Sequence, residues 1–250
     1  MADKTTYAII PSGGIGKRMQ SQKPKQFLTL FDQPILVHTL KALAKTSLID
    51  KFIIPSVDIV YTKKILKNLN INFELCKSGK TRQESIINAL DLIRDKKENP
   101  QYLLIHDAVR ALVQEETVIE VIKKAQEKGA AIAARPVTDT LKLSHHDENG
   151  EILIKKNVSR DLLWQSQTPQ VFTSELLYQA YDQAQKDKFL GTDSAGLVER
   201  INGEVYLVES PQSNIKITTQ EDLELVKHYM LSRDEKKESL KSKISALSQE

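Results

Sequence analysis

Glycines and positively charged side chains cluster near the start of the sequence, where together they could hold a polyphosphate. The run reads Pro11-Ser12-Gly13-Gly14-Ile15-Gly16-Lys17-Arg18-Met19, and Lys25 follows shortly after it. Closely spaced glycines let the backbone approach a ligand and turn several N–H groups toward it. The spacing fits neither a Walker A loop nor the dinucleotide-binding fingerprint. A surface turn with solvated cations has a similar composition, so the place of the run in the fold must decide between the two interpretations.

A carboxylate stands directly after a second apolar run. Asp107 follows residues 102–105, which form a continuous apolar stretch, and His106. An aspartate at the carboxyl end of a buried strand lies where a metal–nucleotide complex would bind, and Mg²⁺ prefers one or two carboxylates plus phosphate oxygens. Asp107 is therefore the candidate metal ligand, although an aspartate at this place can also cap a turn. None of the histidines has metal-ligand spacing to another, and His106 is interpreted as structural.

Further cations occur singly along the chain. Arg82 and Ser85 open a predicted helix just after Gly79, and the N-terminus of a helix favours anions. Arg160 follows a predicted hairpin, and Lys216 lies in an extended segment before the last long helix. Each would be an ordinary solvated charge by itself, so none of them identifies a site alone.

The elements that must position these residues alternate between short apolar runs and longer amphipathic ones. Strands are predicted at residues 7–10, 52–54, 73–75, 102–105 and 130–134. Helices are predicted at residues 34–46, 82–94, 115–128, 176–184, 194–200 and 220–230. This alternation predicts an α/β fold with a mostly parallel central sheet and helices on both faces. Ligands bind beyond the carboxyl ends of such strands, where the glycine-rich run and Asp107 both fall.

The alternation breaks after residue 136, where a hairpin is predicted. Two polar, lysine-rich runs at 138–144 and 151–158 flank Asp147-Glu148-Asn149-Gly150, and Asn-Gly between extended runs is a strong hairpin signal. A polar hairpin of this kind would project, so we expect a dimerisation arm at about residues 137–160. A single catalytic domain is expected over residues 1–232, followed by a charged tail or frayed helix at 233–250.

The bulk composition is that of an ordinary soluble protein. The chain has 250 residues, a hydrophobic fraction of 40% and a net charge of +3, which is too small to indicate nucleic-acid binding. Cys76 is the single cysteine, which excludes an internal disulfide and argues against structural zinc. No apolar run has the length of a membrane span or signal segment. We therefore expect a cytoplasmic protein that binds neither nucleic acid nor a membrane.

Six stretches of the sequence form an ordered set of motifs. They are the glycine-rich run with Pro24-Lys25-Gln26-Phe27, His106-Asp107-Ala108-Val109-Arg110, Pro136-Val137-Thr138-Asp139-Thr140-Leu141-Lys142, Leu163-Trp164-Gln165-Ser166-Gln167-Thr168-Pro169-Gln170, Thr192-Asp193 and Asn214-Ile215-Lys216. Together they resemble the signature of the 2-C-methyl-D-erythritol 4-phosphate cytidylyltransferase family, and the set is specific although no single motif is. The resemblance implies a Rossmann-like nucleotidyltransferase fold, CTP and a polyol phosphate as substrates, Mg²⁺ as cofactor, a homodimer joined through the arm, and a place in non-mevalonate isoprenoid synthesis.

The resemblance also implies roles for individual residues. Arg18 and Lys25 match the residues that stabilise the transition state, and Arg160 and Lys216 match the pair that positions the attacking phosphate. The positions that match nucleotide contacts are Ser12, Gly13, Gly14, Gly79 and Ser85. The positions that match the surroundings of the polyol phosphate and the metal are Asp107, Arg110, Thr140 and Thr192. By the family pattern, Thr140 and Arg160 act across the dimer.

Three alternatives remain open on the sequence. Val109 departs from the family pattern and is also seen in ribitol 5-phosphate cytidylyltransferases, whereas Trp164 and residues 139–142 favour the erythritol phosphate as acceptor. A nucleotide-binding regulatory module without turnover is the second alternative, and the complete set of cations argues against it. The third is a nucleic-acid binder, which the scattered basic residues and the lack of a recognised motif disfavour.

Overall fold

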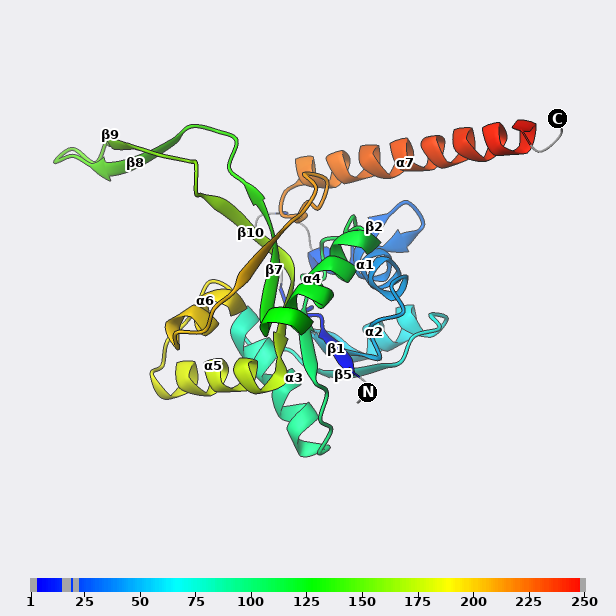
Figure 1. Ribbon diagram of the computed structural model, residues 1–250, viewed down its shortest axis with the longest axis horizontal. Helices are drawn as coiled ribbons and strands as arrows, with labels where there is room; N and C mark the ends of the chain where they lie inside the picture. Colours follow the sequence, from blue (N-terminus) through cyan, green and yellow to red (C-terminus); the bar gives the residue numbers. More distant parts are fainter. Residues whose placement is uncertain (1–3, 15–18, 20–22, 248–250) are drawn as a thin grey trace.

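A central sheet covered by helices organises the molecule (Figure 1). The computed structural model describes residues 4–14, 19 and 23–247, and their side chains as far as residue 233. The strands are β1 (Thr6–Ile9), β2 (Thr29–Leu30), β3 (Gln33–Pro34), β4 (Lys51–Ser56), β5 (Phe73–Lys77), β6 (Tyr102–Ile105), β7 (Ala130–Pro136), β8 (Leu141–His146), β9 (Ile152–Val158), β10 (Trp164–Thr173) and β11 (Tyr206–Glu209). The helices are the 3-10 helix η2 (Lys25–Phe27) and α1 (Ile35–Ala44), α2 (Ile59–Leu66), α3 (Arg82–Asp95), α4 (Glu115–Lys128), α5 (Ser174–Lys186), α6 (Ser194–Arg200) and α7 (Gln220–Leu247).

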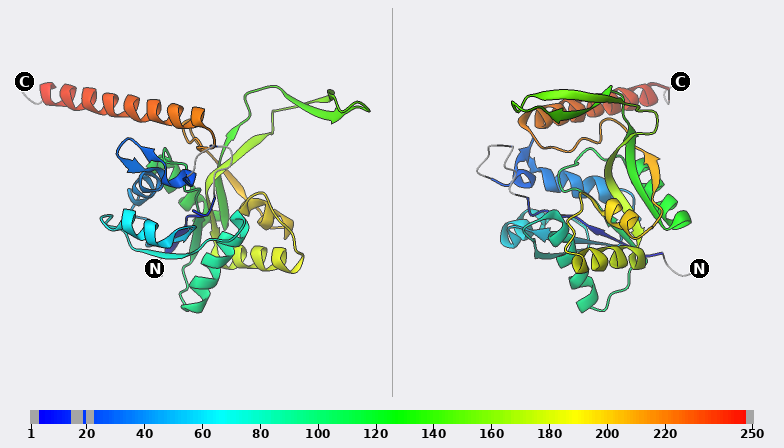
Figure 2. Two further views of the ribbon diagram at one scale, coloured as in Figure 1. Left: turned by 180° about the vertical axis from the view of Figure 1, so that it is seen from behind. Right: turned by 90° about the vertical axis from the view of Figure 1, so that its left-hand side faces the viewer.

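The helices form two layers, one on each face of the sheet (Figure 2). Side chains of α1, α2 and α4 pack with Ala8 and Ile10, whereas side chains of α3, α5 and α6 pack with Ile9 and Ile53. Successive residues of β1 thus face opposite layers, as the alternation of side chains along a strand requires. Because both faces are covered, the central strands consist of continuous apolar runs. The predicted α/β layering is confirmed.

The order of the strands places β1 and β6 at the middle of the sheet. Within the described residues the sheet has seven strands in the order β11-β7-β10-β6-β1-β4-β5. Neighbouring strands run parallel except at β10, which pairs antiparallel with both β6 and β7. The register of β10 shifts between Ser166 and Gln170, and such an irregularity re-aims side chains at a sheet rim. The sequence pattern predicts five of the parallel strands, β1, β4, β5, β6 and β7, but it predicts neither β10 nor the parallel edge strand β11.

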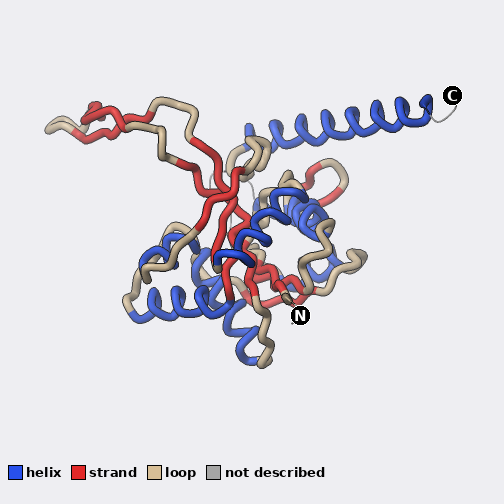
Figure 3. The backbone as a smooth tube through the Cα atoms, in the orientation of Figure 1, coloured by secondary structure: helices blue, strands red, loops and turns tan. Residues whose placement is uncertain are grey.

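The hairpin of β8 and β9 projects from the body, and α7 projects in the opposite direction (Figure 3). At the hairpin turn, the Asp147 N–H donates to the Glu151 carbonyl at 3.0 Å. Gly150 has a φ of +82°, a conformation that glycine adopts without steric cost. The predicted hairpin is confirmed, and it carries large exposed apolar side chains at Ile152 and Ile154, which are 72% and 66% exposed.

The C-terminal helix is longer than the predicted helix at 220–230. It continues to Leu247, so the segment expected to be a tail or frayed helix is helical through most of its length. Lysine, glutamate and leucine are frequent there and have high helix propensity, which explains a helix without a strong apolar stripe. None of the described helices is both long and apolar enough to cross a membrane.

Candidate active site

Two adjoining cavities lie along the carboxyl ends of the central strands. The first, about 200 Å³, we call the glycine cavity; its lining includes Gly13, Gly14 and Gly79. The second, about 240 Å³, we call the threonine cavity; its lining includes Thr168 and Thr192. Both cavities are also lined by three charged residues, Arg82, Asp107 and Lys216. A single groove therefore has a charged junction between a glycine-rich half and a hydroxyl-rich half.

Close backbone approach explains two glycines of the glycine cavity. A Cβ atom at Gly13 would collide with the side chain of Ser78, and a Cβ atom at Gly79 would collide with Glu84. The loop after β1 can therefore approach the loop after β5 only because position 13 carries no side chain, and the loop after β5 can pack on α3 only because position 79 carries none. Gly14 faces open space, which leaves its backbone accessible to a ligand.

The N-terminus of α3 faces the glycine cavity. Thr81 caps the helix by accepting a hydrogen bond from the Glu84 N–H at 3.0 Å. The Ser85 hydroxyl accepts from the Gly79 N–H at 3.0 Å and donates to the Thr81 carbonyl at 2.9 Å, which fixes the loop against the helix. The N-terminus of a helix carries partial positive charge and favours phosphate.

Lys25 brings a cation to the same cavity. It opens η2, and its Nζ donates to the Ile217 carbonyl at 3.2 Å. Next to it, Gln26 donates to the Ser12 carbonyl at 2.8 Å and ties η2 to the end of β1. The Ser12 hydroxyl is buried, has no hydrogen-bond partner among the described residues, and does not belong to the described lining of either cavity. Arg18 lies outside the described residues.

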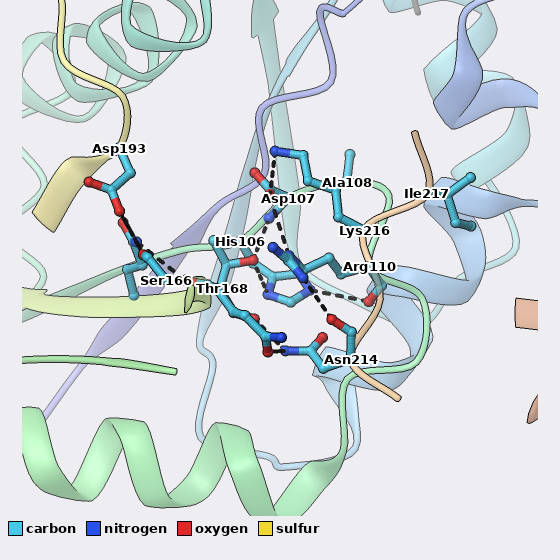
Figure 4. A network of polar contacts seen from close by, with 12 residues as sticks. His106, Asp107, Ala108, Arg110, Ser166, Thr168, Asp193, Asn214, Lys216 and Ile217 are labelled. Atoms are coloured by element: carbon cyan, nitrogen blue, oxygen red, sulfur yellow. Dashed lines mark hydrogen bonds and ion pairs between the residues drawn. The ribbon is translucent and has the colours of Figure 1, made fainter. Parts of the chain in front are cut away.

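Asp107 sits at the junction of the two cavities with three cations around it, and Figure 4 shows two of them, Arg110 and Lys216. Its Oδ1 lies 3.2 Å from Nε of Arg82, and its Oδ2 lies 3.0 Å from Nζ of Lys216 and 3.4 Å from Nε of Arg110. Burial alone would raise the pKa of Asp107, but the three cations hold that pKa well below its usual range. Three cations around one carboxylate leave a surplus of positive charge where two anionic substrates could meet.

A buried hydrogen-bond network holds Arg110 and Lys216 in place. Arg110 donates to the Asn214 carbonyl at 2.7 Å, and the Asn214 amide donates to the Thr168 carbonyl at 2.9 Å. His106 lies 3.1 Å from the Thr168 hydroxyl and 3.3 Å from the Arg110 carbonyl, and burial lowers the pKa of His106 to about 4. A neutral, buried His106 agrees with the structural role predicted for it.

The threonine cavity offers amides and hydroxyls beside the cations. Gln167, Thr168 and Gln170 reach it from the irregular part of β10. Asp193 accepts hydrogen bonds from the Ser166 hydroxyl at 2.7 Å and from the Gln170 amide at 2.9 Å, and it also caps α6. Thr192 is exposed and lines the cavity. Such a lining suits a ligand with several hydroxyl groups and one phosphate.

Two predicted residues lie at the base of the projecting hairpin instead. Thr140 and Arg160 are exposed, and Arg160 donates to the Thr138 carbonyl. Neither belongs to the described lining of the two cavities. A single chain therefore does not bring these two residues to the groove.

Sequence reasoning missed three contributors to the groove. Gln167, Gln170 and Asp193 stand inside quoted motifs but carry no individual signal, because their function depends on the bulged β10. Arg82 was expected only as a cation at a helix start, yet it reaches both cavities. Arg82 lies one residue after a threonine cap and three residues after Gly79, and this position at the start of a helix could have identified it as an anion-binding residue.

The described residues hold no ready-made metal centre. No group of three or more histidine, cysteine, aspartate or glutamate side chains among them could hold a metal ion. Asp107 offers one carboxylate, and its lowered pKa keeps that carboxylate ionised at neutral pH. One carboxylate fits a Mg²⁺ ion that takes its other ligands from phosphate oxygens and water.

Comparison with known proteins identifies the family of this chain. The model of the 2-C-methyl-D-erythritol 4-phosphate cytidylyltransferase family matches residues 6–232. The chain belongs to this family. A cytidylyltransferase of that name from Syntrophus aciditrophicus is 39% identical over 231 residues, covering 89% of this chain and 94% of the relative. The one from Bacillus cytotoxicus is 38% identical over 226 residues, covering 89% and 96%.

Solved structures agree with this assignment. The 4-diphosphocytidyl-2C-methyl-D-erythritol synthase of Anaerococcus prevotii has a TM-score of 0.74 and 29% identity, covering 92% of this chain and 99% of that protein. The 2-C-methyl-D-erythritol 4-phosphate cytidylyltransferase of Francisella tularensis has a TM-score of 0.75 and 30% identity, covering 89% and 98%. As a member of the cytidylyltransferase family, the chain is a nucleotidyltransferase with the Rossmann-like fold expected from its motifs.

Proposed function

We propose that this protein transfers CMP from CTP to 2-C-methyl-D-erythritol 4-phosphate. The products are 4-diphosphocytidyl-2-C-methyl-D-erythritol and pyrophosphate, in non-mevalonate isoprenoid synthesis. The observation that carries the proposal is the charge surplus around Asp107, because it lies where a triphosphate and a phosphate monoester can meet. Nothing in the comparisons favours D-ribitol 5-phosphate. The proposal requires pyrophosphate release that depends on both substrates.

The reaction needs positioned cations rather than a general base. A phosphate monoester is already anionic at neutral pH, so its oxygen can attack directly. That oxygen forms a bond to the α-phosphorus of CTP while the bond to the β-phosphate oxygen breaks and pyrophosphate leaves. Negative charge builds on the equatorial oxygens, and catalysis is mostly alignment and electrostatic stabilisation. Lys25 and Lys216 supply preplaced charge, and Arg18 joins them by its match to the family motif.

The two halves of the groove suit the two substrates. We assign CTP to the glycine cavity, where Gly13 and Gly14 offer backbone N–H groups, and where the Gly79 N–H, bonded to Ser85, holds the neighbouring loop against the start of α3. Ser12 lies in the loop after β1, and Ser85 lies in the first turn of α3. We assign the acceptor to the threonine cavity, with Arg110 and Thr192 as contacts. Mg²⁺ bound at Asp107 and the phosphates would neutralise part of the triphosphate charge.

We further propose that the enzyme is a homodimer in which the arm completes the site of the other subunit. The arm projects with exposed isoleucines, and a second copy could cover them. Thr140 and Arg160 lie at the base of the arm and outside the groove of their own chain. An isologous dimer would bring them to the groove of the other subunit. We place this dimer, with residues 1–232 as one catalytic domain, in the cytoplasm.

Mixing two inactive variants should restore activity if the site is shared. Arg18→Ala and Arg160→Ala are each expected to be inactive as homodimers. A heterodimer would contain one site with both arginines intact, so random subunit exchange should restore about one quarter of wild-type turnover. Pyrophosphate release from the mixture measures the rescue, and native mass spectrometry confirms the exchange. Full exchange without rescue would show that Arg160 does not act across the dimer.

A further inference from the structure

One side chain connects the two halves of the groove. The amide of Gln83, in the first turn of α3, forms two hydrogen bonds to the loop at residues 187–193. Its Nε2 donates to the Phe189 carbonyl at 2.9 Å, and its Oε1 accepts from the Gly191 N–H at 2.9 Å. The next residue of the loop is Thr192, which lines the threonine cavity. A residue on the helix of the glycine cavity thus holds the backbone beside the other cavity.

Several contacts hold the first turn of α3, which carries Gln83. Gln83 follows Arg82, whose guanidinium is ion-paired with Asp107 at 3.2 Å. The threonine cap and the Ser85 hydroxyl hold the same turn of the helix. The position of the Gln83 amide is therefore set by the charged junction and by the start of α3.

The loop at residues 187–193 is also held by contacts that do not involve Gln83. A Cβ atom at Gly191 would collide with the side chain of Leu197, so the loop packs tightly on α6. The guanidinium of Arg200 lies 4.4 Å from the centre of the Phe189 ring and pairs with Asp187 at 3.0 Å. These contacts anchor the loop to α6, whereas Gln83 anchors it to α3. Asp193 at the end of the loop also accepts hydrogen bonds from β10, and the Phe189 N–H donates to the Ala184 carbonyl of α5 at 2.9 Å, so Gln83 supplies the hydrogen bonds that join the loop to α3.

We propose that Gln83 is a positioning residue that sets the place of Thr192 against the nucleotide half of the groove, and thereby the affinity for the acceptor phosphate. This inference rests on the proposed binding of the acceptor in the threonine cavity. Gln83 acts through the loop backbone and does not touch the reacting atoms. Its amide supplies one donor and one acceptor at matched positions, which an apolar side chain of similar length cannot do.

The test is steady-state kinetics on Gln83→Met, which keeps the side-chain length and removes both hydrogen bonds. We expect the KM for 2-C-methyl-D-erythritol 4-phosphate to rise about tenfold, because two net hydrogen bonds are lost. The kcat and the KM for CTP should change less than about twofold. Gln83→Glu keeps an acceptor for Gly191 but faces the Phe189 carbonyl with a second oxygen, so a similar rise is expected. Gln179→Met, at an exposed amide on α5, is the matched control and should behave as wild type.

Thr192→Val separates this inference from the proposed acceptor site. A rise in acceptor KM in Thr192→Val without a rise in Gln83→Met would overturn the positioning role and leave the acceptor site standing. An unchanged acceptor KM in both variants would overturn the acceptor site and the positioning role together. A fall in kcat, or equal rises in both KM values, in Gln83→Met would indicate a general structural role and would also overturn the inference.

Discussion

Replacing Lys25 by alanine should lower kcat by about two to three orders of magnitude while the protein stays folded. Lys25 opens η2 and lines the glycine cavity together with Lys216. Its ammonium group is held against the Ile217 carbonyl at 3.2 Å, so the charge is in place before the transition state forms. A preplaced cation stabilises developing charge without reorganisation, which is why its loss affects turnover strongly.

The Lys25 experiment needs a check on folding and a matched lysine. Gln26 binds the Ser12 carbonyl and Phe27 is buried, so η2 keeps its own anchors in Lys25→Ala. A thermal melt should therefore be close to that of the wild type. Lys41→Ala removes an exposed lysine that bonds the Gln33 side chain on the surface, and its kcat should not change. Turnover near the wild-type level in folded Lys25→Ala would rule out its assigned role.

Replacing Asp107 by asparagine should lower the free energy of unfolding by about 2–4 kcal/mol, because the cations around it lose their counter-charge. Arg110 is buried, and Arg82 and Lys216 are partly so. Equilibrium unfolding in urea measures the change. The control is Asp182→Asn, which breaks an exposed ion pair with Arg94 and should cost less than about 1 kcal/mol. A loss for Asp107→Asn no greater than the control would contradict the electrostatic role.

The difference in the free energy of unfolding between the wild type and Asp107→Asn should depend on pH. Cations hold the folded-state pKa of Asp107 well below its unfolded value, which is near 4. A depressed carboxylate pKa stabilises the fold above the unfolded pKa, and this stabilisation is lost as pH falls toward the folded pKa. The stability difference between wild type and Asp107→Asn should thus be constant from about pH 5 to pH 8 and shrink below about pH 4. A difference that grows on acidification would have the wrong sign.

Local patterns predict the parts of this fold that local physics determines. Continuous apolar runs gave the strands β1, β4 and β6, because burial on both faces removes polar positions. The glycine after α4 closes that helix with a φ of +91° and a hydrogen bond to Ala125, as expected of a C-terminal glycine. The hairpin was predicted from Asn-Gly between two extended runs. Helix α2 was not predicted, although Asp58 caps its start, because few of its side chains are buried.

The remaining features depend on contacts distant in sequence. Strand β10 returns from the arm into the middle of the sheet, and its polar residues are buried because hydrogen bonds satisfy them, which no periodicity encodes. Asp107 and Lys216 likewise meet only because the segment before α7 pairs with the loop after β6. The place of Asp107 after a buried strand marked it as a candidate, whereas Lys216 stood out only as a single cation, and the resemblance to the family gave both a role in the site. The roles of all the predicted site residues stay predictions, and those of Arg18, Thr140 and Arg160 have no support from the described groove either.

Pyrophosphate release with CTP and Mg²⁺, compared between two acceptors, tests most directly what this enzyme does. We expect kcat/KM for 2-C-methyl-D-erythritol 4-phosphate to exceed that for D-ribitol 5-phosphate by at least about a hundredfold, and chelation by EDTA to abolish release. Preference for D-ribitol 5-phosphate would keep the groove and its chemistry but contradict the proposed acceptor. No release with either acceptor, from folded protein with Mg²⁺ present, would contradict the cytidylyl transfer itself.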